Sequence, residues 1–514
     1  MRSRDSTTVH SDCKIIEAIR KLPQEGKFFF RIEEKEWFEL VRSLPSKKLS
    51  FLMLWCHAND VQILFLENGY RPIGIKVALS LNRYQAISPF LPAAIPYERM
   101  LVDFLGKEGM NAVDLRPWID RGYWEYTWPW LDKPILSHAK NTNDNFEELS
   151  DSSKMKGQID LKITSNDCDR ALTPVWHLSL TNDKIIQAES LYGYTHRGIL
   201  SSLRGKNISE CMPSINRINA LDNVAHQIAF SHAIEDMAGR VPSRPVLQGR
   251  IILLELSRMS AYLLYLSQLF EGLQVKLLSS RLEIARELLM RWCHDCFGHR
   301  WLMECIDFGC VKSVKPKHRQ DLKRLPYKIK QLYDEAKALF QEFPDLVKRL
   351  EKIGILTYEQ ALQFNVGGVI GRASGRDLDI RRYADEYQLE WLPPCNGTGG
   401  DVLTRVRLYF HEIDNSLRII DTLLYGLYGD DTFKNCKESF TEKNSGEGVG
   451  VCEGINGDLW YYVSVEKGKI DDIFIRDPAT NQAFALQQIM KNTLWHDWDL
   501  IQSSFGILVT GVDF

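Results

Sequence analysis

The 514-residue sequence lacks any apolar run long enough to cross a lipid bilayer. Its richest apolar stretch, residues 251–273, is interrupted by Glu255, Arg258 and several serines. Residues 1–21 carry charges of both signs and lack the apolar core of a secretory signal. From these absences we expect a chain without a membrane-spanning segment, in a cytoplasmic location.

An excess of charge of one sign is also missing. Lys and Arg number 64 against 67 Asp and Glu, which gives a formal net charge of -3. No basic field is therefore available to attract nucleic acid or an anionic membrane surface, and protein or small-molecule partners are favoured. The 11 cysteines are odd in number and scattered, which is typical of reduced thiols rather than of a disulfide framework.

Several signatures of catalytic sites do not occur. The sequence contains no phosphate-binding G-x-x-x-x-G-K-S/T, no G-x-S-x-G nucleophile elbow and no H-E-x-x-H zinc motif. Four cysteines do lie close together, at Cys293, Cys296, Cys305 and Cys310. The first two end an apolar helical pattern, where cysteines commonly behave as small buried hydrophobes, so we predict no metal site. The G-x-G-x-G of residues 446–450 lacks a following helix and predicts a turn that leads into a strand.

The distribution of residue types predicts two domains and an α+β fold class. Residues 141–158 are polar, acidic and rich in serine and asparagine, which is typical of a linker. The patterns before it are short strands at 28–32 and 61–66 and helices at 15–22 and 34–44. They predict a small α/β domain over residues 1–140.

The second predicted domain, residues 159–514, is mainly helical with peripheral β-strands. Its patterns are strands at 175–180 and 184–192, a long helical region at 214–364, and a turn-rich and strand-rich tail at 446–514. Within that tail, residues 459–465 predict a buried strand.

One predicted helix, residues 217–239, carries a polar stripe. Because they are spaced by three and four residues, four polar side chains share one face: Asn219, Asp222, Asn223 and His226. Such a stripe is compatible with a solvated helix face. It is also the way in which a helix presents two groups to one ligand or proton-transfer centre. The residues leave both interpretations open.

The next predicted helix, residues 245–273, follows an N-cap at Ser243 and is apolar on most sides. Arg250, Glu255 and Arg258 project from it within about 140° of one another. Charges in a helical core usually pair with each other, so we predict a buried Arg-Glu-Arg network with a structural role.

Several segments occur in a recognisable order along the chain. They are 193–198 (GYTHRG), 217–235, 249–258, 366–375 (VGGVIGRASG) with Asp377, Asp379 and Arg381, and short motifs at 400–402, 405–420 and 446–448. In this order they resemble the large subunit shared by group 4 nickel-iron hydrogenases and the quinone site of complex I. The resemblance implies the fold of that subunit for residues 159–514.

The amino-terminal part resembles a smaller complex I subunit. The matching segments are 90–94 (FLPAA), 97–99 (YER), 103–106 (DFLG) and 114–117 (DLRP). In formate-hydrogenlyase-type hydrogenases this subunit is fused ahead of the large subunit, so the fusion implies the hydrogenase-4 branch of the family.

The chain departs from the nickel enzymes at the positions of their metal ligands. Those enzymes use two C-x-x-C pairs, whose positions fall here on Asn219 and Asp222 and, approximately, on Leu508 and Gly511. An amide, a carboxylate, a leucine and a glycine lack the charge and the softness of four thiolates. The resemblance therefore implies a chain that binds no metal and has no hydrogenase activity.

In complex I the vacated region admits a quinone beside an iron-sulfur cluster that a neighbouring subunit holds. By this analogy, Arg217, Asn219, Asp222 and His226 would line a cavity that faces the partner's cluster. Catalytic, proton-supplying roles are implied for Asp222 and His226, and cofactor-binding roles for His196, Arg197, Arg217 and Asn219. Two contacts of the complex I site are not matched. Residues 163–170 contain no histidine, and the position of the quinone-contacting tyrosine falls near Ala220.

The function implied is that of a peripheral subunit, on the cytoplasmic face of the inner membrane, of a complex I-like or hydrogenase-4-like oxidoreductase. Its partners would be an iron-sulfur small subunit and antiporter-like and other membrane subunits, without nucleic acid. The chain would bind no cofactor alone, with a quinone as the possible acceptor, and a link to NADH or NAD comes from the family only. Two alternatives stay open: a non-catalytic scaffold subunit of the same complex, and an active hydrogenase.

Overall fold

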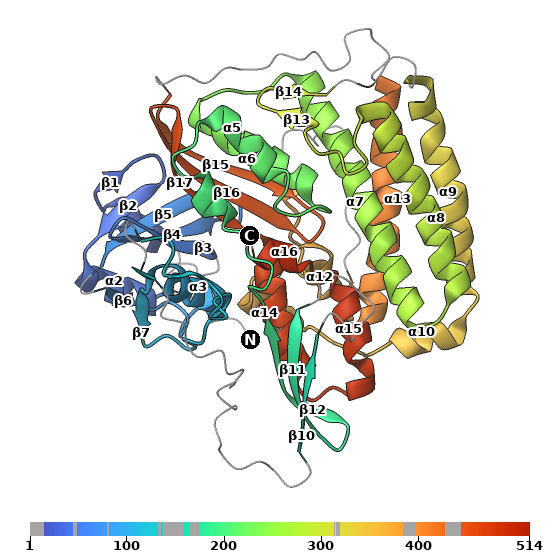
Figure 1. Ribbon diagram of the computed structural model, residues 1–514, viewed down its shortest axis with the longest axis horizontal. Coiled ribbons are helices and arrows are strands. Elements are labelled where there is room, and N and C mark those ends of the chain that lie inside the picture. Colours follow the sequence, from blue (N-terminus) through green and yellow to red (C-terminus); the bar gives the residue numbers. More distant parts are fainter. Residues whose placement is uncertain are drawn as a thin grey trace, which may run out of the picture.

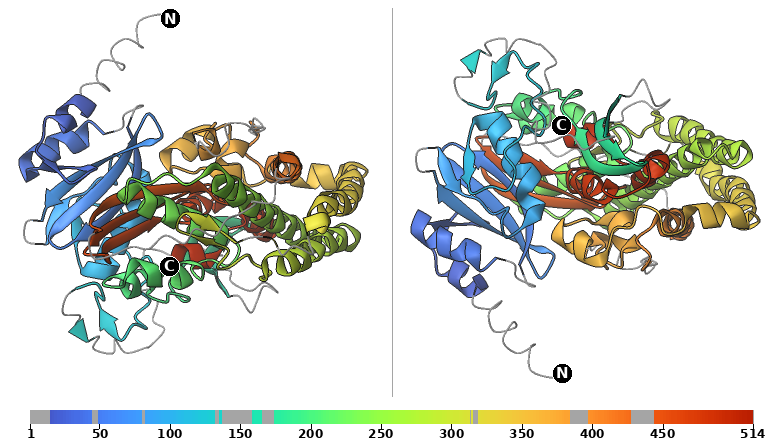
Figure 2. Two further views of the ribbon diagram at one scale, coloured as in Figure 1. Left: turned by 90° about the horizontal axis from the view of Figure 1, so that it is seen from above. Right: turned by 90° about the horizontal axis from the view of Figure 1, so that it is seen from below.

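The computed structural model describes residues 15–44, 49–79, 82–131, 135–136, 158–164, 174–312, 314, 319–383, 397–426 and 444–513. Within these ranges an amino-terminal sheet, a central sheet and a layer of long helices follow one another across the molecule (Figure 1, Figure 2). The α+β class predicted from the sequence is confirmed. The predicted linker at 141–158 lies outside the described residues except for Gln158.

The amino-terminal sheet has the strand order β1-β2-β5-β4-β3, with β2 and β5 parallel and the other neighbours antiparallel. Its strands are β1 Gln24–Glu25, β2 Phe29–Ile32, β3 Leu49–His57, β4 Asp60–Glu67 and β5 Arg71–Ala78. The long runs LSFLMLWCH and DVQILFLE of β3 and β4 are almost wholly buried, as expected for strands covered on both faces. Helices α2 Glu34–Arg42 and α3 Ile95–Leu105 pack against this sheet, beside the short pairs β6 Arg83–Gln85 with β7 Glu108–Met110 and β8 Tyr126–Thr127 with β9 Ile135–Leu136.

Strand β3 also packs against the central sheet, which consists of three antiparallel strands, β15 Gly446–Glu453, β16 Asp458–Glu466 and β17 Lys469–Arg476. The Trp55 ring stacks on that of Phe474, with centroids 5.3 Å apart and an interplanar angle of 6°. The Trp55 indole nitrogen donates to Asp472 Oδ2 over 2.7 Å. This buried aromatic contact fastens the amino-terminal sheet to the carboxyl-terminal half of the chain.

Helix α6, Asn223–Met237, lies against β15 of the central sheet (Figure 1). A Cβ at Gly448 would lie 1.9 Å from the Ala233 carbonyl oxygen, and one at Gly450 would lie 2.0 Å from that of Ala229. The prediction that residues 446–450 form a turn is therefore wrong. They are the strand itself, and two of them lack side chains because a helix backbone passes over them.

Helix α6 begins later than the predicted helix at residue 217. Asn219 lies in the preceding turn and Asp222 is the N-cap, so the prediction that both share a helical face with His226 is wrong. The Asn219 Oδ1 accepts from the Leu221 amide over 3.2 Å, a local bond that competes with helix formation. Residues 223–231 are buried on every side of α6, which excludes the solvated-face interpretation.

The helical layer lies on the other side of the central sheet from the amino-terminal sheet (Figure 1, Figure 2). Its long members are α7 Arg244–Gly272, α8 Lys276–Phe297, α9 Arg319–Gln341 and α13 Val402–Gly426, with the shorter α10 Pro344–Leu350, α11 Tyr358–Gln363 and α12 Gly368–Ala373 and the hairpin β13 Ile306–Asp307, β14 Cys310–Val311. Helix α7 confirms the helix predicted at 245–273, including its N-cap Ser243. No helix in the described ranges combines the length and the apolarity needed to cross a membrane.

The remaining segments correct the predicted tail. The strands expected at 175–180 and 184–192 are β11 Val175–Thr181 and β12 Lys184–Leu191, which form a sheet with β10 Ile159–Ile163 and are followed by α4 Ile199–Leu203 and α5 Ile208–Ile215. The buried strand predicted at 459–465 is β16. Beyond β17, however, the chain is helical, with α14 Pro478–Met490, α15 Trp498–Phe505 and α16 Val509–Asp513. The overlooked signal is Asp477, which caps α14 just before Pro478 in its first turn.

Candidate functional site

A cavity of about 610 Å³ lies between α7, the turn before α6, and the segment that joins α15 to α16. Its walls come from residues 218–221, from Leu264, Tyr265 and Gln268 of α7, from Trp301 and Met303, and from residues between Gln502 and Thr510. Aliphatic and aromatic side chains form much of this lining, and the two glutamines add amide groups. Such a lining suits a ligand with an apolar body and a polar end.

Three of the predicted cofactor-binding residues, Arg197, Arg217 and Asn219, line the cavity. Arg197 donates through its two terminal nitrogens to the carbonyl oxygens of Arg217 and Ile218, over 2.6 Å each. Arg217 pairs with Glu304 over 2.8 Å, and both side chains are more than half exposed. Arg197 thus ties the 193–198 turn to the cavity wall.

The fourth residue of that set, His196, is not among the described residues that line the cavity. Its Nδ1 lies 2.5 Å from the Asp513 carbonyl oxygen, and its ring lies 5.0 Å from that of Trp124. Burial lowers the pKa of His196 and so favours the neutral imidazole, although Asp513 acts in the opposite direction. The Asp513 carboxylate accepts from the Gly193 and Thr195 amides over 2.7 and 2.9 Å. His196 and Asp513 together fasten the end of α16 to the 193–198 turn.

The two predicted catalytic residues, Asp222 and His226, are fully buried, and neither is among the described residues of the cavity wall. The Ile455 amide donates to the Asp222 carboxylate, with N–O distances of 3.1 and 3.2 Å. The His226 Nδ1 lies 2.7 Å from the Tyr461 hydroxyl, and its Nε2 lies 3.6 Å from Asp477 Oδ2. Burial raises the pKa of Asp222 to about 6, against the opposing influence of His226 and with a further rise from Asp477. A carboxyl group of this pKa beside an imidazole can exchange protons near neutral pH.

Leu221 and Tyr265 separate this buried pair from the cavity. Leu221 precedes Asp222 in the chain and lines the cavity, as does the Tyr265 side chain. Burial raises the pKa of Tyr265 well above its ordinary value, and Tyr409 and Asp222 raise it further. Asp222 therefore lies next to two residues of the cavity wall.

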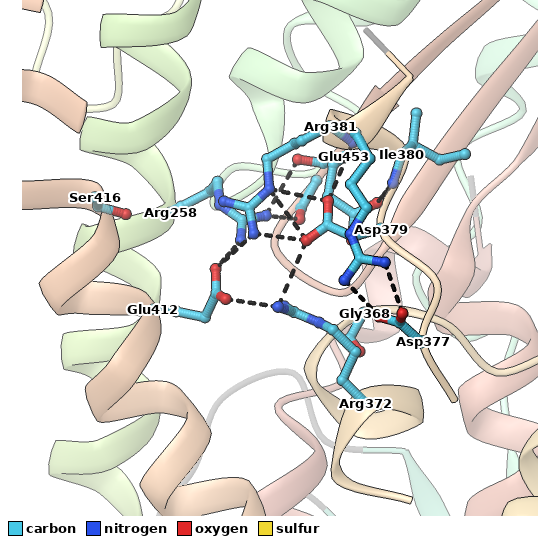
Figure 3. Close-up of polar contacts among 12 residues, drawn as sticks. Arg258, Gly368, Arg372, Asp377, Asp379, Ile380, Arg381, Glu412, Ser416 and Glu453 are labelled. Atoms are coloured by element: carbon cyan, nitrogen blue, oxygen red, sulfur yellow. Dashed lines mark hydrogen bonds and ion pairs between the residues drawn. The ribbon is translucent and has the colours of Figure 1, made fainter. Parts of the chain in front are cut away.

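A second set of buried charges lies between α7, α12 and α13 (Figure 3). We call it the ionic cluster; its members are Glu255, Arg258, Arg372, Asp379, Arg381 and Glu412. Glu412 accepts from Arg258 over 2.5 Å and from Arg372 over 2.6 Å, and Arg381 pairs with Asp379 over 2.7 Å. Three guanidinium groups thus meet three carboxylates, which is how charges are accommodated inside a core.

The ionic cluster corrects the predicted Arg-Glu-Arg network of α7. Glu255 and Arg258 do lie 3.5 Å apart, but Arg250 pairs with Glu235 of α6 over 2.5 Å. The partner of each charge depends on which element faces it, and this cannot be read from one helix. Glu453 was not predicted from the sequence either; burial raises its pKa to about 8, with further rises from Asp379 and Asp458.

The four clustered cysteines are buried. Burial raises the pKa of Cys305 to about 12 and that of Cys293 well above its usual value. Thiols of this kind stay protonated at neutral pH, whereas the thiolate is the metal ligand. Throughout the described ranges, no group of three or more His, Cys, Asp or Glu side chains is arranged to hold a metal ion.

Comparisons with known proteins place these features in a family context. Residues 281–435 match the family described as "Respiratory-chain NADH dehydrogenase, 49 Kd subunit". A subunit of NADH-quinone oxidoreductase from Helicobacter pylori is 31% identical over 257 residues, which are 48% of this chain and 61% of that subunit. The corresponding protein from Syntrophobacter fumaroxidans is 26% identical over 353 residues, 65% of this chain and 91% of that one. Over these residues the chain is similar to the 49 kDa subunit of the respiratory-chain NADH dehydrogenase.

The comparison of folds agrees with this relationship. A chain in the structure of the membrane-bound sulfane sulfur reductase, an archaeal respiratory membrane complex, matches with a TM-score of 0.64 at 22% identity. The match covers 70% of this chain and 99% of that chain. The present chain spans 61% of the length of the Helicobacter pylori protein.

The family resemblance of the sequence singled out four positions, at residues 219, 222, 508 and 511. Asn219 and Leu508 both line the cavity. At the other two positions carboxylates come close: Asp222 is itself one of them, and a Cβ at Gly511 would lie 2.7 Å from Asp477 Oδ2. The segment 163–170, where the resemblance would place the headgroup-binding histidine of complex I, lies outside the described residues except for Ile163 and Thr164.

Two polar contacts of the His226 ring, Asp477 and Tyr461, were not predicted from the sequence. The dipeptide Asp477-Pro478 signals a helix start, which is visible in the sequence. The proximity of Asp477 to His226 cannot be read from the sequence, because α6 and α14 are far apart along the chain.

Proposed function

We propose that this chain is a peripheral subunit of a membrane-bound, complex I-like oxidoreductase. It helps to transfer electrons from an iron-sulfur cluster in a partner subunit to a quinone-type acceptor. The hydrogenase-4-like branch is the finer form of the proposal, because the amino-terminal segment resembles the small subunit fused in that branch. The proposed partners are an iron-sulfur small subunit and antiporter-like membrane subunits, at the cytoplasmic face of the membrane.

The observation that carries this proposal is the cavity of about 610 Å³ whose lining includes Leu221, the residue next to Asp222 in the chain. A quinone consists of a polar ring and an apolar tail, which corresponds to the mixed lining of the cavity. Its reduction consumes protons as well as electrons. Asp222, with a pKa of about 6, and His226 are groups that can deliver those protons.

The proposal excludes nickel chemistry because an amide, a carboxylate, a leucine and a glycine stand at the four former ligand positions. Metal analysis of the purified complex is expected to find iron without stoichiometric nickel. Nickel at one atom per complex would overturn this part of the proposal.

The test of the proposal is quinone reduction by the purified complex. Asp222→Asn and His226→Ala are each expected to lower kcat by about 100-fold, the usual contribution of a positioned proton donor. Leu508→Phe, which adds bulk to the cavity wall, is expected to raise the KM for the quinone. Asp401→Asn is the matched control, because Asp401 is a capping carboxylate that accepts from the Thr404 amide and is not among the cavity-lining residues.

One observation favours the scaffold alternative: Asp222 and His226 are buried and do not themselves line the cavity. A scaffold subunit would keep these groups for stability only. Wild-type rates in both Asp222→Asn and His226→Ala, in complexes that assemble normally, would support the scaffold and reject the redox role.

A further inference from the structure

Asp477 is a buried carboxylate that the proposed function does not use. Its Oδ1 caps α14 by accepting from the Ala479 amide over 2.8 Å. Its Oδ2 faces His226 Nε2 at 3.6 Å, and the two side chains are 2% and 0% exposed. Within the described part of the chain neither of these two atoms has a hydrogen-bond partner. Leaving both unsatisfied would be costly, so the pair is best explained as two groups that share a proton.

Two glycines make room for carboxylates around His226. A Cβ at Gly511 would lie 2.7 Å from Asp477 Oδ2, and a Cβ at Gly454 would lie 2.4 Å from Asp222 Oδ2. Neither carboxylate could keep its place if these residues had side chains. The positions of Asp222 and Asp477 therefore each depend on a glycine, at residues 454 and 511, that leaves room for the carboxylate.

Tyr461 sets the orientation of the proton on His226. Its hydroxyl lies 2.7 Å from Nδ1, and burial holds the pKa of Tyr461 well above its ordinary value, so the hydroxyl keeps its proton. When the hydroxyl donates to Nδ1, the proton of the neutral imidazole resides on Nε2 and faces Asp477; when the ring is an imidazolium, the hydroxyl oxygen accepts from Nδ1–H and Nε2–H still faces Asp477.

The other charged groups near this site are already engaged. Arg476 pairs with Asp458 over 2.7 Å, and Arg258 pairs with Glu412 over 2.5 Å. Burial also raises the pKa values of Tyr97 and Tyr265, so both hydroxyls stay protonated. The groups left to exchange protons are Asp222, His226 and Asp477, which we call the buried triad.

We propose that Asp477 is a positioning residue and proton acceptor for His226, and that its Oδ2 exchanges a proton with His226 Nε2. In the forward direction the Nε2–H bond of the imidazolium breaks and an O–H bond forms on Asp477, which leaves a neutral imidazole with its proton on Nδ1 and the Tyr461 oxygen as its acceptor. The reverse step returns the proton to Nε2. The step needs no further reactant. The inference rests on the proposed function in one respect: the proton is finally delivered to the acceptor in the neighbouring cavity.

The kinetic test uses the intact complex, reduced with dithionite and reoxidised by decylubiquinone across a range of pH. Asp477→Asn keeps the capping oxygen and should lower kcat at least about tenfold, shift the pH profile and leave KM unchanged. Gly511→Ala, which crowds the same oxygen, should act in the same direction. The capping variant Asp401→Asn should keep the wild-type profile. A wild-type pH profile in Asp477→Asn, while Asp222→Asn is impaired, would overturn the inference and leave the proposed function standing.

A second measurement does not depend on activity. The unfolding free energies of the full-length wild-type chain, of Asp477→Asn, of His226→Gln and of the double variant are measured from pH 5 to pH 8. A coupling between the two substitutions that changes with pH supports a shared proton, even if the complex reduces no quinone and the proposed function fails. Strict additivity at every pH would overturn the inference.

Discussion

The ionic cluster and the buried triad are two sets of charged residues in one core, and they deal with burial in different ways. Burial alone would raise the pKa of Glu412, but Arg372, Arg381 and Arg258 hold it well below its usual value. In the triad a single imidazole serves two carboxylates, and the pKa of Asp222 rises to about 6. A carboxylate surrounded by guanidinium groups keeps a fixed charge, whereas one beside an imidazole remains able to titrate. The first arrangement stabilises the fold, and the second suits proton transfer.

The largest effect is expected from breaking the ionic cluster. Glu412→Gln removes the carboxylate that contacts three arginines and leaves buried positive charge uncompensated, which should cost about 3–5 kcal/mol of unfolding free energy. Chemical denaturation measures this change. Asp377→Asn, at an exposed pair with Arg382, is the control and should change stability by less than about 1 kcal/mol. Equal effects of the two substitutions would show that the cluster has no special role.

Glu453 lies next to the ionic cluster, but like Asp222 of the buried triad it has a raised pKa, so the stability of the chain should depend on its titration. Because its pKa is raised from 4.5 to about 8, the unfolded chain loses this proton at lower pH than the folded chain does. The stability of the wild type relative to Glu453→Gln should therefore fall between pH 4.5 and 8, by roughly 5 kcal/mol, and then stay constant. Unfolding of both chains across this range measures the difference. Parallel stability curves would mean that the guanidinium groups dominate here as well.

The stability of the wild type relative to Asp222→Asn should also fall as the pH rises, but over a narrower pH range. The pKa of Asp222 is raised from 3.8 to about 6, so the wild type should lose about 3 kcal/mol relative to the variant between these pH values. Chemical denaturation of both chains at a series of pH values measures the loss, and above about pH 6 the difference should no longer change. A wild-type chain that instead gains stability on this interval would place an unrecognised positive charge beside the triad.

The smallest effect belongs to the exposed pair at the cavity, Arg217 with Glu304. Glu304→Gln should change the unfolding free energy by less than about 1 kcal/mol, and the change should shrink further at high salt. Thermal unfolding at low and high ionic strength measures it. A larger loss that persists in salt would assign this pair to the core rather than to the surface.

Elements with a strong local pattern could be predicted from the sequence. Helix α7 and strands β11, β12 and β16 lie where their periodicity and caps indicated. The start of α6 was predicted six residues too early, at 217 instead of 223, because the side chain of Asn219 forms a turn in place of the helix. The glycines at 446–450 were misassigned because the helix that requires them is far away in the sequence.

The residues of the candidate site are distributed over different places in the fold. Arg197, Arg217 and Asn219 line one cavity, Asp222 and His226 are not among its described lining residues, and His196 contacts the end of α16. Asp477 escaped notice because a capping aspartate before a proline signals only a helix start. That it also faces His226 follows from the packing of α14 near α6, which no local pattern reveals.

The sequence by itself determined which chemical groups are available: an asparagine, a carboxylate, a leucine and a glycine at residues 219, 222, 508 and 511, a histidine nearby, and an apolar helix that carries arginines and glutamates. Only the tertiary structure decided which of these charges are neutralised and which remain able to titrate. The proton affinity of a buried group depends on its distance from water and from charges on other elements, and the folded chain alone fixes those distances.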